Sequence, residues 1–289
     1  MRILLFSGSH PRHLFIHRAL FAQFEICGVV AMQREQLIVA PPAGITDHDR
    51  QLFVRHFDER FAIERATYGE ETPEAVFAGI PALFCGPAEL NTAETAAFVR
   101  RCRPDVVFIF GVDLIKEPVM GVLPHDKVNL HLGLSPWYRG AATLFWPFYN
   151  LEPQYAGATF HQIVAAADAG AVIHQCVPVL KKGDGIHDVG FRTVVQARDD
   201  LVRLFTHRAS HDRFEGQTQK TTGRLYLSTQ FRAAHLRLIY DLYDNRIVDE
   251  YLAGHLGQHQ PKLVRSREVV GLTAPAACER PLLNAAASN

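Results

Sequence analysis

The sequence lacks the features that would place it among nucleic-acid-binding, membrane or secreted proteins. Its 30 Lys+Arg residues are balanced by 30 Asp+Glu residues, whereas a dedicated nucleic-acid binder usually carries a clear basic excess. No apolar run approaches the ~20 residues that a membrane-spanning helix needs. The apolar run in the opening stretch MRILLFSGSH is too short for the hydrophobic region of a signal peptide. We therefore expect a cytoplasmic protein that has neither a membrane nor a nucleic acid as its partner.

Cysteine is scarce, and the common cofactor motifs are missing. The five cysteines are widely spaced and form no CxxC pair, which excludes a zinc knuckle or a thioredoxin-like redox site. Only Gly8 follows the first apolar run, so the GxGxxG motif of nicotinamide-binding proteins is absent. His10, His13 and His17 share a helical face but have neither an HExxH context nor a Cys partner. We expect no metal site.

The sequence does contain a regular alternation of strand and helix patterns. Short apolar runs at 2–6, 26–32, 80–85 and 105–110 are typical of strands buried on both faces. Segments with helical spacing separate them, and further strands are expected at 128–133, 156–164 and 171–180. This order predicts an α/β protein with a Rossmann-like, mostly parallel sheet.

The remaining segments suggest how the chain is organised. After Thr46, a predicted N-cap, Phe53, Phe57 and Phe61 recur every fourth residue, and we expect this aromatic face to pack on the sheet. A long helix is expected from 186 to 207. Residues 206–266 are expected to form a smaller C-terminal α+β region, with TTGRLYLS as one arm of a hairpin. We therefore divide the chain into a large domain (1–205), this region (206–266) and a loose tail (267–289).

A polar pair on an otherwise apolar strand is the first candidate for chemistry. Asn129 and His131 are two residues apart, so their side chains leave the same face of the sheet. Such a pair is costly in a dry core and is expected at a cleft. An amide donor can stabilise an oxyanion, and an imidazole can exchange a proton near neutral pH. Asp168, in a loop of small residues between two predicted strands, could orient that imidazole.

Four motifs in order resemble a known family. NLHLGLSP (129–136), YRG (138–140), GATFHQ (157–162) and DAGAVI (168–173) are similar to the pattern of the folate-dependent formyltransferases. The resemblance covers residues 1–205 and is strongest to the sugar-nucleotide N-formyltransferases. It implies the formyltransferase fold and an enzyme that moves a formyl group from 10-formyltetrahydrofolate to the amine of a nucleotide-linked amino sugar, as in lipopolysaccharide biosynthesis.

The resemblance also assigns roles to residues of this sequence. The catalytic trio would be Asn129, His131 and Asp168. The pteridine slot would be formed by Gly111, Val112, Leu114, Ile115, Val164, Ala166 and Ala167. The acceptor would contact Ser9, His10, Tyr138, Arg139 and His161. No metal is implied, and a homodimer formed through the predicted hairpin is expected.

The sequence departs from the family pattern in two places. Ser135-Pro136 stands where the family has Leu-Pro, and Ala171 replaces a second acidic residue. These departures argue against the tRNA and purine branches. Two alternatives remain open: a methionyl-tRNA or other small-amine formyltransferase, and a non-catalytic folate- or nucleotide-binding module. The intact trio argues against the module, because binding alone does not require those three residues.

Overall fold

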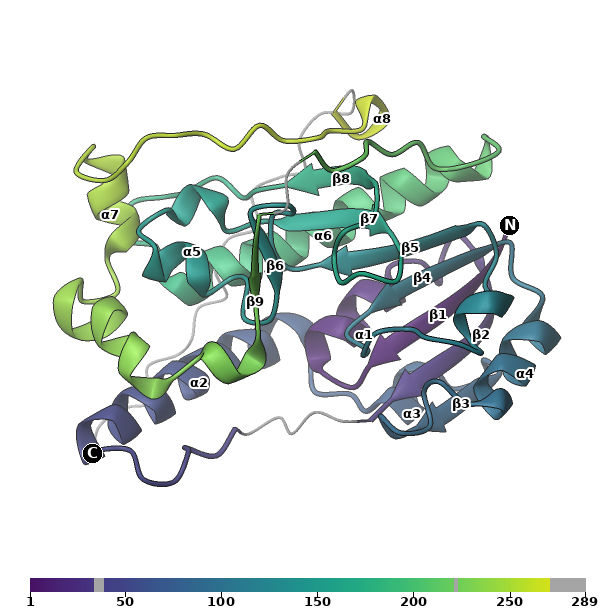
Figure 1. The fold of residues 1–289 in the computed structure, drawn as a ribbon, viewed down its shortest axis with the longest axis horizontal. Coiled ribbons are helices and arrows are strands. Elements are labelled where there is room, and N and C mark those ends of the chain that lie inside the picture. Colours follow the sequence, from purple (N-terminus) through teal and green to yellow (C-terminus); the bar gives the residue numbers. More distant parts are fainter. Residues whose placement is uncertain (34–38, 221–222, 271–289) are drawn as a thin grey trace.

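The core of the protein is a seven-stranded sheet (Figure 1). The computed structural model describes residues 1–33, 39–220 and 223–270. The strands follow the spatial order β3-β2-β1-β4-β5-β7-β8. Their bounds are β1 Arg2–Gly8, β2 Glu25–Met32, β3 Ala82–Cys85, β4 Val106–Phe110, β5 Asp126–His131, β7 Ala158–Gln162 and β8 Val172–Cys176. Neighbours from β3 to β5 are parallel, and β7 pairs antiparallel with both β5 and β8, so β7 runs against the other six strands of this sheet. The predicted fold class is confirmed.

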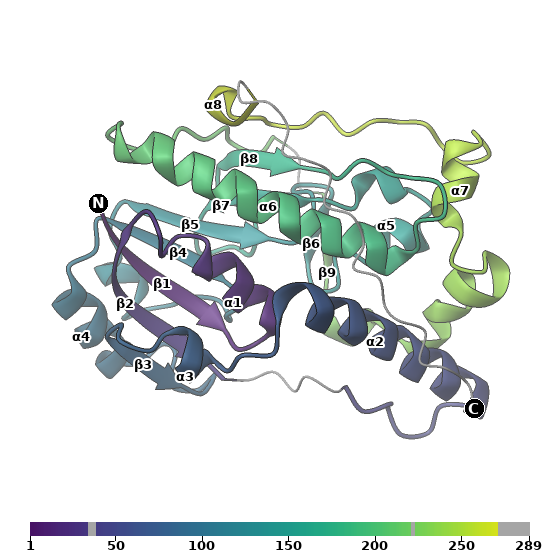
Figure 2. The same cartoon turned by 180° about the vertical axis from the view of Figure 1, so that it is seen from behind.

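Helices cover both faces of this sheet, which explains its continuous apolar strands. Ile3 and Leu5 of β1 belong to a hydrophobic cluster with residues of α1 and α6, and Figure 2 shows these two helices on one face. Leu4 and Phe6 belong to a cluster on the opposite face, with residues of α4. All four side chains are fully buried. The helices are α1 Pro11–Arg18, α2 Asp47–Tyr68, α3 Pro73–Val76, α4 Ala93–Cys102, α5 Trp146–Tyr149, α6 Ile186–Ala209, α7 Ile247–Leu252 and α8 Arg267–Val270.

Capping residues mark the starts of two helices, of which the one at Thr46 was predicted. The Thr46 side chain accepts a hydrogen bond from the backbone N–H of Asp49 at the start of α2. Thr92 does the same for the backbone N–H of Thr95 in α4. Each cap satisfies an N–H group that the first helical turn leaves without a partner. Among the helices that the structure describes, none is long and apolar enough to span a membrane.

Two expectations about packing partners were wrong. Residues 224–226 form β9 (Arg224–Tyr226), which pairs in parallel with β6 (Tyr138–Gly140) and is not one arm of a hairpin. Phe53 of α2 packs in a third hydrophobic cluster, which includes Leu236, Ile239 and other C-terminal side chains, and not on the sheet. The physical reason is the same in both cases: residues distant in sequence bury these surfaces. Beyond α8, the tail expected for 267–289 lies outside the described residues.

Sheet topology places a crevice at one edge. The strand order runs from β1 through β2 to β3 on one side and through β4 to β5 on the other. The direction of winding therefore reverses between β1 and β4. In open α/β sheets, ligands bind outside the carboxyl ends of the strands at such a reversal.

The shared third cluster predicts that the C-terminal region unfolds together with the rest of the protein. Leu236 is fully buried there, whereas Leu242, six residues later, is 71% exposed. Leu236→Ala should lower the free energy of unfolding by about 2–5 kcal/mol. The matched variant Leu242→Ala should stay within about 0.5 kcal/mol of wild type. Denaturant unfolding followed by circular dichroism and tryptophan fluorescence should give one coincident transition. Equal stability of the two variants, or two separate transitions, would contradict the shared core.

Candidate active site

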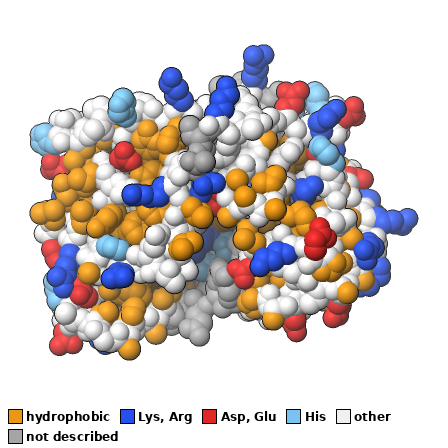
Figure 3. Space-filling view, in the orientation of Figure 1, with side chains coloured by type: hydrophobic (Ala, Val, Ile, Leu, Met, Phe, Trp, Pro, Cys, Tyr) orange, Lys and Arg blue, Asp and Glu red, His pale blue; other side chains and the backbone are white. Residues whose placement is uncertain are grey.

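A cavity of about 660 Å³ opens at the carboxyl ends of β1 and β4. Figure 3 shows the same face of the molecule hollowed near its centre. The cavity is as large as a typical small-molecule site. Its walls come from the loops after these strands, from α1 and α2, from the start of α6 and from the C-terminal Ser228 and Phe231. Asn129, His131 and Asp168 all line it, so the predicted trio lies together at an opening.

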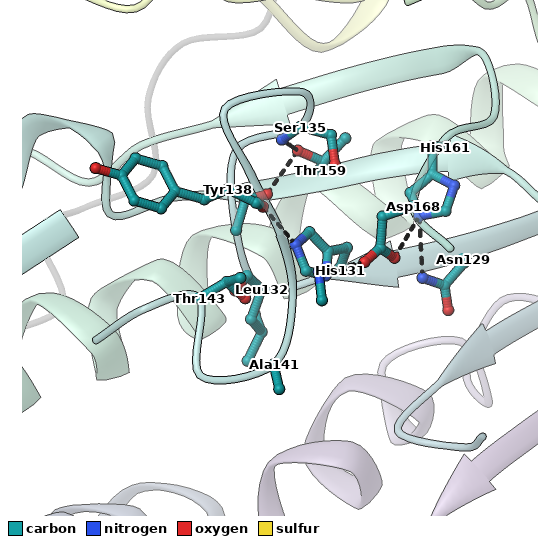
Figure 4. A network of polar contacts seen from close by, with 12 residues as sticks. Asn129, His131, Leu132, Ser135, Tyr138, Ala141, Thr143, Thr159, His161 and Asp168 are labelled. Carbon is teal, nitrogen blue, oxygen red and sulfur yellow. Dashed lines mark hydrogen bonds and ion pairs between the residues drawn. The ribbon is translucent and has the colours of Figure 1, made fainter. Parts of the chain in front are cut away.

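The three residues are joined through a fourth, His161 (Figure 4). Asn129 Nδ2 lies 3.1 Å from His161 Nε2. The Asp168 carboxylate lies between two imidazoles, with Oδ1 at 3.4 Å from His161 Nε2 and Oδ2 at 3.5 Å from His131 Nδ1. Register explains the grouping: Asn129 of β5 stands directly opposite His161 of β7. Leu130 and Phe160, which alternate with these residues, belong to the cluster beneath α6.

His131 is fixed from two sides. Its Nε2 lies 2.8 Å from the backbone carbonyl oxygen of Tyr138, so an Nε2–H donates there and leaves Nδ1 facing Asp168. Gly133 makes this approach possible, because a Cβ at that position would lie 2.5 Å from His131 Nε2. The Tyr138 ring is 3% exposed, and its hydroxyl donates to Glu152 Oε2 at 2.6 Å. The carbonyl that holds His131 is therefore itself anchored.

Asp168 and His131 differ in their protonation state. Burial alone would raise the pKa of the Asp168 carboxyl, but the nearby His131, the contact with His161 and the backbone N–H of Gly140 outweigh it and hold that pKa below its usual value. The Gly140 N–H donates to Oδ2 at 2.8 Å. Burial lowers the pKa of His131, although Asp168 and the Tyr138 carbonyl act in the opposite direction. At neutral pH the pair is therefore a carboxylate beside a neutral imidazole.

Four of the seven residues expected at the pteridine slot line the cavity: Gly111, Val112, Leu114 and Ala167. Asn91 braces the first loop, because its amide donates to the Leu114 carbonyl at 3.0 Å and its oxygen accepts from the Lys116 N–H at 2.7 Å.

The other three positions, Ile115, Val164 and Ala166, do not line the cavity. The Ile115 side chain is 5% exposed and packs in the cluster around α4. Val164 and Ala166 are exposed outside the cavity, because the loop before Asp168 turns them towards solvent.

The acceptor residues expected from the sequence lie away from the cavity. His10 is 3% exposed beside Glu64, and burial lowers its pKa. The Tyr138 ring stacks on Tyr226 with 5.8 Å between centroids. His161 does not line the cavity and contacts Asn129 and Asp168, which do. Ser9 and Arg139 are half-buried and do not line the opening. Packing and internal hydrogen bonds occupy the side chains of Tyr138 and His161, which the sequence pattern could not show.

A polar stripe on α2 faces the cavity and was not anticipated. His56, Arg60 and Glu64 are four residues apart, and all three line the opening. Arg12 of α1 reaches the same wall and lies 3.0 Å from Glu64 Oε1. The Arg60 charge and, above all, burial lower the pKa of His56. The i, i+4 spacing of 56, 60 and 64, beside the aromatic stripe at 53, 57 and 61, was the signal that could have identified this wall.

No group of three His, Cys, Asp or Glu side chains that could hold a metal ion occurs in the described part of the chain.

Comparisons with known proteins identify the family and the fold. The model of the family described as Formyl transferase matches residues 45–204, which is more than half of the chain. An N-formyltransferase from Helicobacter canadensis, solved with folinic acid and dTDP-3-aminofucose, has a TM-score of 0.55 and 15% identity over 87% of this chain and 82% of its own. A sugar N-formyltransferase from Shewanella sp. has a TM-score of 0.54 and 14% identity over 80% and 78%.

A phosphoribosylglycinamide formyltransferase from Anaplasma phagocytophilum has a TM-score of 0.51 and 17% identity over 79% of this chain and 98% of its own. At these identities the three structures establish a shared fold. The family match adds the kind of chemistry, and it includes the strands and loops that carry Asn129, His131 and Asp168. The chain therefore belongs to the formyl transferase family and is a formyltransferase.

Proposed function

We propose that the protein transfers a formyl group from 10-formyltetrahydrofolate to the amine of a nucleotide-linked amino sugar, with Asn129, His131 and Asp168 as its catalytic residues. The observation that carries the proposal is their convergence on the wall of one cavity, around a carboxylate that contacts two imidazoles. That arrangement contains an oxyanion donor and a proton acceptor within one group of contacts.

The donor would lie against the loop after β4. Gly111, Val112 and Leu114 offer an apolar wall with backbone groups, and Ala167 faces the same cavity. A flat heterocycle such as a pteridine is held by such a combination of apolar surface and a few polar contacts. The Helicobacter canadensis relative of similar fold contains folinic acid, which supports a folate as the donor here.

The chemistry follows from the positions of the polar atoms. The acceptor nitrogen attacks the formyl carbon, and a carbon–nitrogen bond forms while the formyl oxygen gains negative charge. Asn129 Nδ2 has two hydrogens, of which one is directed to His161, and the second can donate to that oxygen. Collapse of the intermediate breaks the bond from the formyl carbon to the folate N10.

The proton released by the amine would pass to the His131–Asp168 pair. Neutral His131 presents Nδ1 without a hydrogen, and a proton there would form an imidazolium between the Asp168 carboxylate and the Tyr138 carbonyl. The same proton can then be returned to N10 of the leaving folate. One imidazole thus serves as base and then as acid, without a covalent intermediate.

The opposite wall supports an anionic acceptor. Arg12 and Arg60 line it, and the acidic residue there is Glu64, 3.0 Å from Arg12. Burial holds the pKa of His187 at about 3 and that of His56 well below its usual value, so both are neutral hydrogen-bonding groups at pH 7. Two guanidinium groups beside neutral imidazoles suit the diphosphate of a nucleotide sugar.

The activity is tested by supplying 10-formyltetrahydrofolate with a panel of amino-sugar nucleotides, initiator Met-tRNA and a hydroxylamine acceptor. Tetrahydrofolate release is followed by absorbance, and products are identified by mass spectrometry. We expect formylation of a sugar nucleotide. Asn129→Ala and His131→Ala should each lower kcat by about 10²–10³-fold, while the surface variant His255→Ala should match wild type. Turnover with Met-tRNA but with no sugar nucleotide would contradict the proposed acceptor. Folate binding without formyl transfer to any amine would contradict the proposed activity.

A second prediction concerns the cationic wall. Arg60→Gln should raise KM for the sugar nucleotide about 10- to 100-fold, because a charge-assisted hydrogen bond to phosphate is lost. The KM for the folate donor should stay unchanged, and so should kinetics with a free amino sugar that lacks the diphosphate. Arg50→Gln, an exposed arginine of the same helix, is the matched control. An equal rise in KM for the donor would show that the arginine does not recognise the acceptor.

A further inference from the structure

Two C-terminal stretches, 217–220 and 223–226, contact both elements that carry the His131–Asp168 pair. Gln217 forms an antiparallel bridge with Val172 at the start of β8, directly after the loop that holds Asp168. Tyr226 of β9 pairs with Gly140 of β6, and its carbonyl accepts the Ala141 N–H at 2.8 Å. Both stretches follow the part of the chain that the family model matches, which ends at residue 204.

Asp168 has an unusual backbone conformation. Its φ is +50°, in the left-handed region that residues with a Cβ seldom adopt. Aspartate adopts this conformation more readily than most residues, and neighbouring contacts stabilise it there. The loop around it is built from small residues, Ala167, Ala169 and Gly170, which offer few side-chain contacts of their own.

Gln219 supplies such contacts. Its Nε2 donates to the carbonyl oxygens of Asp168 and of Gly170, each at 2.8 Å. The two bonds hold the peptide groups on either side of the Ala169–Gly170 pair, so they fix the turn from which the Asp168 side chain extends. The Asp168 carboxylate is thereby directed at Gly140 N, His131 Nδ1 and His161 Nε2.

β9 holds the other half of the pair. β6 provides the Tyr138 carbonyl that binds His131 Nε2 and the Gly140 N–H that binds Asp168. β9 pairs with β6 over residues 138–140, and Tyr226 stacks on Tyr138 at 5.8 Å with an interplanar angle of 6°. The two stretches therefore brace the imidazole through β6 and the carboxylate through Gln219.

We propose that Gln219 is a positioning residue for formyl transfer: its two hydrogen bonds hold the Asp168 loop so that the carboxylate meets His131 and His161. The proposal deepens the proposed function and rests on it, because Asp168 must act in the reaction for its position to matter. Gln219 itself touches neither substrate nor reacting atom. Its removal should affect the rate of the bound complex more than the binding of either substrate.

Three variants test this proposal. Gln219→Met keeps the length of the side chain and removes both N–H donors, whereas Gln219→Lys restores donors that can reach two carbonyls. Gln217→Met is the control two residues earlier, where the hydrogen bonds to Val172 come from the backbone. Gln219→Met should lower kcat about 10- to 100-fold with both KM values within about twofold. Gln219→Lys should recover most of the loss, and Gln217→Met should match wild type.

Melting temperatures distinguish a positioning role of Gln219 from an effect on folding. Imidazole resonances test that role independently of the proposed function. Gln219→Met should have the same melting temperature as Gln217→Met. In free protein labelled with ¹⁵N-histidine, Gln219→Met should shift the imidazole ¹⁵N resonances of His131 and His161. These resonances are assigned with the variants His131→Gln and His161→Gln. Unchanged resonances, a kcat equal to that of Gln217→Met, or no recovery with lysine would overturn the proposal. If wild type formylates no acceptor, the proposed function fails, and the resonances still decide whether Gln219 positions the cluster.

Discussion

A single carboxylate, that of Asp168, holds the candidate site together. It lies within 3.5 Å of one ring nitrogen of His131 and of one of His161, and it accepts the Gly140 N–H. Four chain segments, β5, β6, β7 and the loop before β8, meet at this group. In a buried setting an unpaired carboxylate would be costly, and these contacts keep it ionised. The proton affinity of His131, the orientation of His161 and, through it, the amide of Asn129 all depend on where this charge lies.

The fold produces that meeting point by ordinary means. Parallel strands buried on both faces bring the carboxyl ends of β1, β4 and β5 to one edge of the sheet. The antiparallel β7 then brings His161 opposite Asn129. Within the residues that the family model matches, α2 closes the cavity with its stripe of His56, Arg60 and Glu64. The C-terminal segment adds β9 beside β6. In our proposal the strands and loops around Asp168 supply the group-transfer chemistry, α2 forms the acceptor side of the cavity, and the C-terminal segment braces the His131–Asp168 pair.

Most of the framework could be predicted from the sequence, since local patterns determine it. The apolar run at 105–110 became β4, Thr46 capped its helix, and the N-x-H spacing placed Asn129 and His131 on one strand face. What depends on distant packing was beyond prediction. Phe53 packs on C-terminal residues, Ile115 enters a core cluster, and residues 224–226 pair with a strand 86 positions earlier. Tyr138, expected at the acceptor, is instead stacked and hydrogen-bonded in the interior.

The most direct test removes the negative charge of Asp168 while keeping the shape of its side chain. Asp168→Asn keeps an oxygen and adds an amide group, and calorimetry would measure binding of 10-formyltetrahydrofolate while single-turnover experiments measure formyl transfer. The account predicts donor binding close to that of wild type and a transfer rate lower by at least ~10²-fold, because the proton taken up by His131 loses its counterion. A transfer rate within a few-fold of wild type would contradict it.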